Sequence, residues 1–389
     1  MAEPAPPFAV LLREAQGQAP RLAESAANLR AAKGLADQAG AAPNPVVGLQ
    51  VEDIGRRDTA GISQRQSTLS VSQALELGGK RGTRLAAGRA DVGVAEARDR
   101  AARSDFAYDL ALTYATAEAA QKRVVLLTDD LGRAREDLRA ARAFVEAGRE
   151  ADLRAVEAQA AATAAEADVE TARADAAEAL ARLSGMAGAA APYGSVGASL
   201  LEATARLPAP GAIPTVTPAL ALAQADREAA ARRIRVERAR AVPDVTFSLG
   251  ARKYADNGDT ALIAGVSAPL PLFDRNRGSV AAARAQLSAA EARLNGARID
   301  AQTGWLAAAA QAASGDLRLK AAGDGQAAAR EAYRLSRLGY EAGRTSLLEL
   351  SSARRSLVEA QTRLIDAQLA RVRAETVLAR LAGRIPFGE

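Results

Sequence analysis

The chain has 389 residues, of which 49% are hydrophobic and only 3% aromatic, and it carries no histidine and no cysteine. The apolar half therefore consists mostly of small aliphatic residues, which make narrow helix faces rather than a bulky core. A cysteine or histidine zinc site, a cysteine nucleophile, a disulfide and any acid–base step through imidazole are excluded. The composition argues against an enzyme, and we predict no cofactor and no metal site.

The charges are nearly balanced, with 51 Lys and Arg against 46 Asp and Glu, a net +5. Basic and acidic residues alternate along the chain and aromatic residues for base stacking are scarce, which favours a solvated helix surface and no nucleic-acid partner. No apolar stretch approaches the roughly 18–20 residues of a membrane helix. Residues 1–7 lack the basic and apolar regions of a signal peptide, so we expect either a cytoplasmic protein or a chain that has lost its export signal.

Four pairs of segments recur about half a chain apart. They are Ser72–Leu77 with Ser267–Leu272, Val145–Arg149 with Tyr340–Arg344, Ala179–Gly185 with Val377–Gly383, and Pro45 with Pro243. Self-similarity at one offset indicates a repeat architecture. The sequence therefore predicts a tandem duplication, with a first repeat over residues 1–194 and a second over residues 195–389.

Each repeat is predicted to run as a helix, two strands and a long helical hairpin, with a linker before the helix of the second repeat. Period-two alternation of apolar and polar residues predicts the strands Val46–Asp53, Thr68–Ala74, Val245–Arg252 and Ala261–Ser267. With their polar loops these strands form β-hairpins at about 45–77 and 243–272. The helical hairpins then cover about 79–185 and 275–383.

The helices carry a heptad pattern. Apolar residues recur every seven positions at Leu110, Ala117, Val124, Leu131, Leu138 and Val145, and the second repeat continues this stride from Trp305 to Tyr340. The first helix would run roughly 90–100 Å. A fibrous coiled coil is the simpler interpretation, but fibres do not contain embedded β-hairpins. We expect each helical hairpin to turn at a glycine, Gly148 or Gly343, because glycine tolerates the left-handed conformation of a tight turn.

Four strands cannot close a barrel, and an open sheet leaves two unpaired edges. Alternating strands of about 8–10 residues are typical of a membrane barrel with one face toward lipid and the other toward the lumen. In lipid, unpaired edges are too costly, so closure would need further copies of the chain. The alternative is a small sheet that caps a soluble helical bundle.

This duplicated plan resembles the TolC family of outer-membrane efflux channels, as do the turn glycines and the two strand-to-helix corners. The corners resemble most closely the heavy-metal branch, which serves cobalt–zinc–cadmium or copper–silver systems. Their residues are Gly78, Gly79, Gly82, Pro269, Pro271, Asp274 and Gly278. The alternatives are a drug-efflux or type I secretion channel of the same family, and a soluble coiled-coil scaffold.

The resemblance implies a mainly α fold with a β membrane part: a homotrimer with a twelve-stranded β-barrel in outer-membrane lipid, continued by a twelve-helix coiled-coil α-barrel in the periplasm. It implies a passive exit duct of a tripartite RND-type system, in which a periplasmic adaptor and an inner-membrane RND pump deliver the substrate, here heavy-metal cations. The chain would then be the mature one, and without an N-terminal cysteine a lipid anchor is not expected.

The resemblance also implies a pore constriction near the second turn. Tyr340 matches a constriction tyrosine and Glu349 an acidic ring position, whereas Thr345 stands where a gate arginine is expected and Ser352 where a second acidic residue is expected. Arg154 follows Gly148 by the same interval as Glu349 follows Gly343. We hypothesise that Arg154 pairs with Glu349; the alternative is two solvated charges worth about 0–1 kcal/mol.

The turns themselves are the expected adaptor-docking surface, and the alternative is an ordinary exposed helix turn. The docking residues are Glu146, Gly148, Arg149, Glu341, Gly343 and Arg344. Copper and zinc prefer imidazole and sulfur ligands, which this chain lacks apart from the thioether of Met186 and that of Met1. Exported metals would therefore pass a lumen with carboxylates and no high-affinity site, and their selection would lie in the pump and adaptor.

Overall fold

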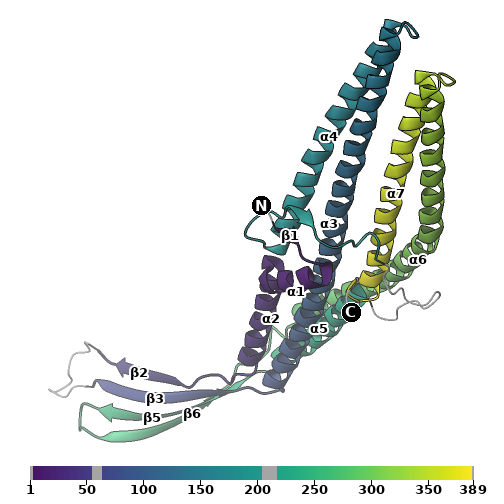
Figure 1. The fold of residues 1–389 in the computed structure, drawn as a ribbon. Helices are drawn as coiled ribbons and strands as arrows, with labels where there is room; N and C mark the ends of the chain where they lie inside the picture. The colour runs from purple at the N-terminus through teal and green to yellow at the C-terminus, as the bar shows by residue number, and fades with distance from the viewer. Residues whose placement is uncertain (1–2, 55–63, 204–216, 388–389) are drawn as a thin grey trace. The chain divides into compact units, whose positions relative to one another are not determined.

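The computed structural model describes residues 3–54, 64–203 and 217–387. The helices are α1 (Phe8–Gln18), α2 (Pro20–Ala39), α3 (Lys80–Glu146), α4 (Asp152–Ala187), α5 (Pro218–Arg240), α6 (Arg277–Glu341) and α7 (Leu347–Leu381) (Figure 1). The strands are β1 (Pro4–Ala5), β2 (Val46–Glu52), β3 (Gln66–Leu75), β4 (Ser195–Val196), β5 (Val245–Tyr254) and β6 (Thr260–Ser267). The order α2-β2-β3-α3-α4 recurs as α5-β5-β6-α6-α7.

The chain forms two compact units, and each takes segments from both halves of the sequence. The hairpin unit contains Met1–Glu24, Arg100–Ala219 and Ile299–Glu389, and the sheet unit contains Ser25–Asp99 and Leu220–Arg298. The boundary predicted between residues 194 and 195 is therefore not a boundary between compact units, and the division into two repeats stays a prediction about the sequence. No helix within the described ranges is long and apolar enough to cross a membrane.

In the sheet unit the four predicted strands form one antiparallel sheet in the order β2-β3-β5-β6 (Figure 1). The central pair extends past the predicted ends, from Leu75 opposite Val245 to Gln66 opposite Tyr254, because cross-strand pairing continues where the apolar alternation stops. Asp53 was predicted to end the first strand, but its φ of 58° takes the backbone out of the extended region, so β2 ends at Glu52.

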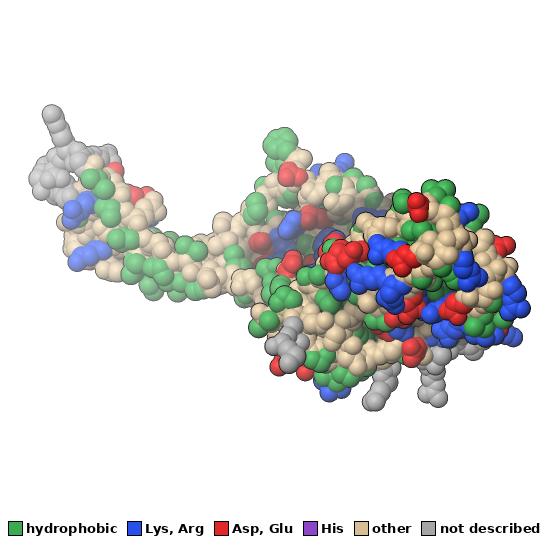
Figure 2. Space-filling model, turned by 45° about the horizontal axis from the view of Figure 1, so that its top comes forward, with side chains coloured by type: hydrophobic (Ala, Val, Ile, Leu, Met, Phe, Trp, Pro, Cys, Tyr) green, Lys and Arg blue, Asp and Glu red, His purple; other side chains and the backbone are tan. Residues whose placement is uncertain are grey.

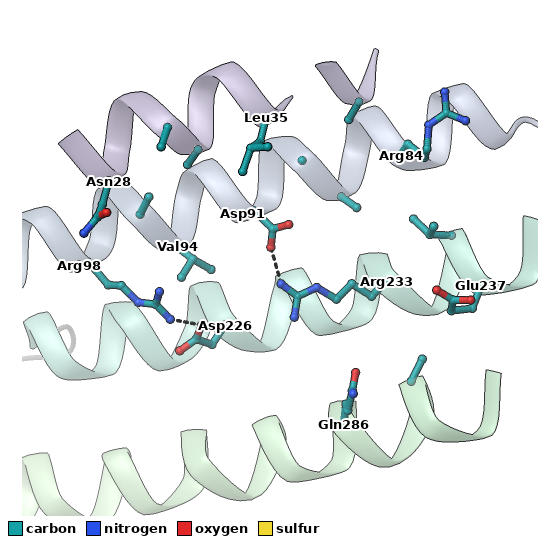
Figure 3. A pocket seen from close by; sticks show the side chains of 18 of the residues that line it. Asn28, Leu35, Arg84, Asp91, Val94, Arg98, Asp226, Arg233, Glu237 and Gln286 are labelled. Atoms are coloured by element: carbon teal, nitrogen blue, oxygen red, sulfur yellow. Dashed lines mark hydrogen bonds and ion pairs between the residues drawn. The ribbon is translucent and has the colours of Figure 1, made fainter. Parts of the chain in front are cut away.

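Beside the sheet, α2, the start of α3, α5 and the start of α6 line an open groove of about 1210 Å³. Figure 3 shows two ion pairs along it, Arg233 to Asp91 at 2.8 Å and Arg98 to Asp226 at 3.5 Å. Asp91 and Arg98 lie seven residues apart on α3, and their partners lie seven apart on α5. The seven-residue spacing thus places two ion pairs between the antiparallel helices α3 and α5. In one pair α3 supplies the acidic residue, and in the other it supplies the basic residue.

In the hairpin unit α3 turns into α4 and α6 turns into α7 (Figure 1). Most of the predicted heptad positions are buried, among them Leu110, Leu131 and Leu138 on α3 and Tyr333 and Tyr340 on α6. An apolar cluster from α3, α4, α6 and α7 joins the two hairpins and includes Leu131, Leu138, Tyr333 and Tyr340, while Leu110 belongs to a second cluster. The seven-residue repeat predicted from the sequence therefore marks the seam between the two hairpins, a location that the repeat alone did not predict.

The predicted first helix is two helices. The chain leaves the helical conformation at Ala19, whose ψ is 118°, and α2 begins at Pro20. Proline disfavours helical backbone at the residue before it and suits the first helical position, so the break is local.

The segment 199–203 is held by two buried charged side chains, one from each long hairpin. Glu118 on α3 accepts hydrogen bonds from the backbone N–H groups of Leu200 and Leu201 at 2.7 and 3.0 Å. Arg371 on α7 donates to the carbonyls of Leu201 and Ala203 at 3.1 and 2.8 Å. We call this segment the strap, because it ties α3 and α7 together.

Candidate functional site

The turns of the two helical hairpins have the same backbone. Gly148 has a φ of 69° and Gly343 a φ of 70°, and both adopt the left-handed conformation predicted from the sequence. The residue after each glycine donates its N–H back into the preceding helix, from Arg149 to Phe144 O at 2.9 Å and from Arg344 to Gly339 O at 2.8 Å. This pattern satisfies the last carbonyls of α3 and α6 and reverses the chain within a few residues.

The helices that follow the turns begin differently. At α7 the Ser346 hydroxyl accepts from the N–H of Glu349 at 3.3 Å, and the Glu349 carboxylate accepts from the N–H of Ser346 at 2.9 Å, which is a capping box. At α4 the cap residue is Ala151, which has no side chain to cap the helix. Glu349 is therefore held at the helix N-terminus, where a negative charge is favoured, while its side chain stays exposed.

Tyr340 links the second hairpin to the first turn. The ring is only 2% exposed and meets Phe144 edge to face, with 5.2 Å between ring centroids. The Tyr340 hydroxyl donates to Glu150 Oε2 at 3.0 Å. Burial, followed by the neighbouring Glu150 carboxylate, raises the pKa of Tyr340 well above its usual value. The hydroxyl therefore keeps its proton, and the donor persists over the physiological pH range.

Thr345 closes its own turn. Its hydroxyl donates to the carbonyl of Ser336 at 3.0 Å, and a Cβ added at Gly339 would lie 2.7 Å from that hydroxyl oxygen. Gly339 is thus required by this close approach. At the position where the resemblance suggests a gate arginine, the threonine makes a local bond that reinforces the turn.

The structure does not bring Arg154 and Glu349 together within the chain. Arg154 pairs with Glu157 one turn further along α4, at 2.8 Å, while the Glu349 carboxylate is used in the capping box. Each charge has a nearer partner on its own helix, which accounts for the difference from the hypothesised pair. Ser352 lies exposed on α7, and the turn residues Glu146, Arg149, Glu341 and Arg344 are also exposed.

Two sets of residues near the turns and in the seam between the hairpins were not predicted from the sequence. Leu153 and Leu348 are 61% and 63% exposed, and they stand 195 positions apart, directly after the two turns. Asp130 and Asp137 are buried on α3 and contact Arg354 of α7. The repeat offset was a signal for the leucines, and a seven-residue spacing of aspartates on a heptad helix was a signal for the second set.

The strand-to-helix corners differ in how they turn. At the first, Gly78 and Gly79 both have positive φ, and at the second Asn276 takes this role with a φ of 56°. Asparagine tolerates the left-handed region better than most residues. The Asn276 side chain also donates to the carbonyl of Glu237 at 2.7 Å. Gly82 and Gly278 lie inside α3 and α6, while Pro269, Pro271 and Asp274 precede α6.

The sheet has one apolar and one polar face. The register places Leu49, Leu69, Val71 and Leu249 on one face, where they are 49–72% exposed. Figure 2 shows hydrophobic side chains gathered along the strands. On the other face Arg252 donates to Thr68 at 3.0 Å and pairs with Glu52 at 3.3 Å, among others. Large exposed apolar patches mark surfaces that contact a partner or a membrane.

The fold is that of solved outer-membrane channels. The outer membrane protein VceC of Vibrio cholerae superposes with a TM-score of 0.80 at 21% identity, over 97% of this chain and 96% of that one. The sequence model of the family described as "Outer membrane efflux protein" matches residues 11–189 and 216–384. The chain belongs to this family, and it is an outer-membrane efflux protein.

Two relatives are named for metal resistance. The nickel and cobalt resistance protein CnrC of Cupriavidus metallidurans is 46% identical over 312 residues, which are 80% of this chain and 75% of that protein. The nickel-cobalt-cadmium resistance protein NccC of Alcaligenes xylosoxydans xylosoxydans is 44% identical over 385 residues, 99% of this chain and 88% of that protein. The resemblance drawn from the turns and corners is confirmed at the level of the family.

Proposed function

We propose that the chain is the outer-membrane duct of a tripartite RND-type efflux system, a conduit rather than a catalyst. The sheet carries the proposal: it has an apolar face and a polar face, and among the described residues its edge strands, β2 and β6, each pair with a strand on one side only. Three copies joined edge to edge would close a twelve-stranded barrel without free edges. The helices of each copy would continue this barrel as a coiled-coil tunnel.

The proposed cargo is heavy-metal cations, in line with the names of CnrC and NccC. The sequence has no histidine or cysteine, and within the described ranges no group of three acidic residues is placed to hold a metal ion. Soft and borderline ions bind tightly to nitrogen and sulfur ligands. A wall without such ligands suits conduction, and substrate choice then falls to the pump and adaptor.

The proposed pore constriction lies near the hairpin turns. It comprises Tyr340, Glu349, Ser352, Thr345 and Arg154, to which the exposed Leu153 and Leu348 are added. Apolar rings gate pores by dewetting, and acidic rings favour cations. The exposed turn residues Glu146, Arg149, Glu341 and Arg344, shaped by Gly148 and Gly343, are the proposed surface for a periplasmic adaptor.

Deletion of the gene in its native host tests the cargo. We expect the host to lose tolerance to nickel and cobalt, and to regain it when the chain is supplied in trans. The control is a panel of drugs and detergents at matched toxicity, to which sensitivity should stay unchanged. Loss of drug tolerance with intact metal tolerance would assign the duct to drug efflux, and a secretion defect would assign it to type I secretion.

Replacing Glu349 with glutamine is expected to lower cation selectivity about threefold in planar bilayers. A cation one Debye length, about 8 Å, from three carboxylates gains roughly 0.6 kcal/mol after screening at 0.15 M salt. Glutamine keeps the capping box, so the start of α7 is preserved. Glu359→Gln, an exposed carboxylate further along α7, is the matched control. If Glu349→Gln and the wild type had equal cation selectivity, Glu349 would not line the constriction.

A further inference from the structure

Arg354 on α7 is buried between two carboxylates of α3. Its Nη1 lies 2.7 Å from Asp130 Oδ2 and its Nε lies 3.6 Å from Asp137 Oδ2. The three side chains are 8%, 10% and 9% exposed. Leu131 and Leu138 on α3 and Leu350 and Leu357 on α7, neighbours of these residues along the chain, belong to the apolar cluster that joins the two hairpins. We call Arg354, Asp130 and Asp137 the clamp.

The clamp buries two carboxylates against one guanidinium and is incomplete in hydrogen bonding. The positive charges of Arg133 and Arg337 also act on Asp130 and Asp137, respectively, but Arg354 is the arginine that is buried with them. Within the part of the chain that the structure describes, Asp130 Oδ1, Arg354 Nε and the Tyr333 hydroxyl have no hydrogen-bond partner. Burying ionised and unpaired polar groups is costly unless the geometry compensates for it. Taking up one proton removes one buried negative charge and lowers this cost.

Burial of Asp137 favours uptake of that proton. Burial raises the pKa of Asp137 to about 6, against the opposing influence of Arg354 and Arg337. Burial also raises the pKa of Asp130. The charged and titratable neighbours of Asp137 are Arg354 on α7, Arg337, Tyr333 and Tyr340 on α6, and Asp130 and Glu136 on α3. Asp130 is also faced by Arg133 on α3 and by Asp168 on α4. Because the two aspartates interact, the proton belongs to the pair.

The strap provides a contrast. It also ties α3 to α7, but Glu118 there accepts two backbone N–H bonds and a hydroxyl bond from Ser199. Charge-assisted bonds of this kind are about twice as strong as neutral ones. The carboxylate at the strap is thus fully paired with donors, although among the described residues Arg371 Nε there has no hydrogen-bond partner, whereas at the clamp one carboxylate oxygen, Asp130 Oδ1, is left without a donor. Of the two links, the clamp is therefore the one that loss of a single proton weakens.

We propose that Arg354, Asp130 and Asp137 are positioning residues that hold the second hairpin against the first, and that uptake of one proton by the aspartate pair strengthens this hold and biases the duct toward its closed form. The proposal rests on the proposed channel function. The clamp contacts no cargo and acts through the position of α7, which carries Leu348 and Glu349.

The direction of the pH effect follows from linkage. When α7 separates from α3, Asp137 meets water and its pKa returns to about 3.9. The packed form therefore binds more protons between about pH 6 and pH 3.9, and it gains stability as the pH falls through this window. This contribution is lost as the pH rises through 6. Between pH 7 and pH 5 the closed-to-open ratio is expected to rise about tenfold.

Asp137→Asn tests the clamp, because asparagine has nearly the shape of aspartic acid and does not titrate. The first measurement is hydrogen exchange of the amides of residues 350–357 in the protein purified in detergent, corrected for intrinsic exchange. The second is the ratio of closed to open time in planar bilayers. In the wild type both are expected to change about tenfold between pH 7 and pH 5. In Asp137→Asn both should change much less over this range, because the single remaining carboxylate, Asp130, is paired with Arg354 and takes up its proton at lower pH. Asp130→Asn leaves one carboxylate facing Arg354, so its transition should move to lower pH.

Arg123→Ala is the matched control. Arg123 and Asp366 also join α3 to α7, at 2.5 Å, but their side chains are 42% and 53% exposed. This variant should keep the wild-type pH dependence. The proposed role of the clamp would be wrong if hydrogen exchange and the closed-to-open ratio of the wild type did not depend on pH. It would also be wrong if Asp137→Asn showed the same pH dependence as the wild type. Absence of conductance with the expected exchange profile would instead overturn the channel function and leave the clamp standing.

Discussion

Arg354→Met is expected to lower the free energy of unfolding by about 3–5 kcal/mol at pH 7, because it leaves two buried carboxylates without their cation. The loss should shrink at pH 5. The pKa of Asp137 is raised to about 6 by burial, and without the guanidinium it rises further, so the acids become neutral at low pH. The measurement is the thermal unfolding midpoint in detergent at fixed protein concentration, since the stability of an oligomer depends on concentration.

Two further variants separate charge burial from a general loss of packing. Arg123→Met removes an exposed arginine from the same pair of helices and should cost no more than about 1 kcal/mol. Combining Arg354→Met with Asp130→Leu and Asp137→Leu should recover most of the stability, because apolar replacement of a buried ion cluster is often neutral or better. If the combined variant were as unstable as Arg354→Met, the loss would come from the shape of the site.

Tyr340→Ala is the second change with a large expected effect. It removes a ring that is 2% exposed and leaves a cavity beside Phe144, a loss of about 3–5 kcal/mol by analogy with other aromatic deletions. It also releases the end of α6 from the first turn. We therefore expect a lower unfolding midpoint together with a larger open fraction in planar bilayers.

Tyr340→Phe isolates the hydrogen bond within this effect. The ring and its contact with Phe144 remain, and only the bond to Glu150 is lost, worth about 1.5 kcal/mol for a charged acceptor. Its open fraction should lie between those of the wild type and Tyr340→Ala. A wild-type open fraction in Tyr340→Ala, with the unfolding midpoint lowered, would make Tyr340 a stability residue without a role in gating.

The secondary structure was predictable because local pattern and tertiary environment agree. The alternation in 245–252 reflects a sheet with one apolar and one polar face, and the heptad stride on α3 reflects a continuous seam against a second hairpin. The errors lie at element ends. Asp53 leaves the extended region, and Pro20 divides a helix that the pattern treats as one. Such ends are decided by single backbone angles that periodicity does not register.

The site was only partly predictable. Gly148 and Gly343 identified both turns, since a left-handed turn needs a residue without a Cβ. The partner of Tyr340 was missed because Glu150 precedes α4, outside the helical pattern. Arg154 and Glu349 stand at equal distances from their turns, which suggested a pair. Within the chain each side chain instead bonds to a group about one turn away, Glu157 or the Ser346 N–H, because such a contact needs no long-range ordering.

The long helices, the four strands of the sheet, their duplicated order, the glycine turns and the absence of histidine and cysteine ligands are all readable from residue type and spacing along one chain. The contacts of Arg354 with Asp130 and Asp137, and the hydrogen bonds of Glu118 and Arg371 to the strap, become visible only in the folded chain. These charges come from segments more than 80 residues apart in the chain, except for the two aspartates of α3. Burial makes such contacts strong, and burial depends on which helices pack together, which spacing along the chain does not encode.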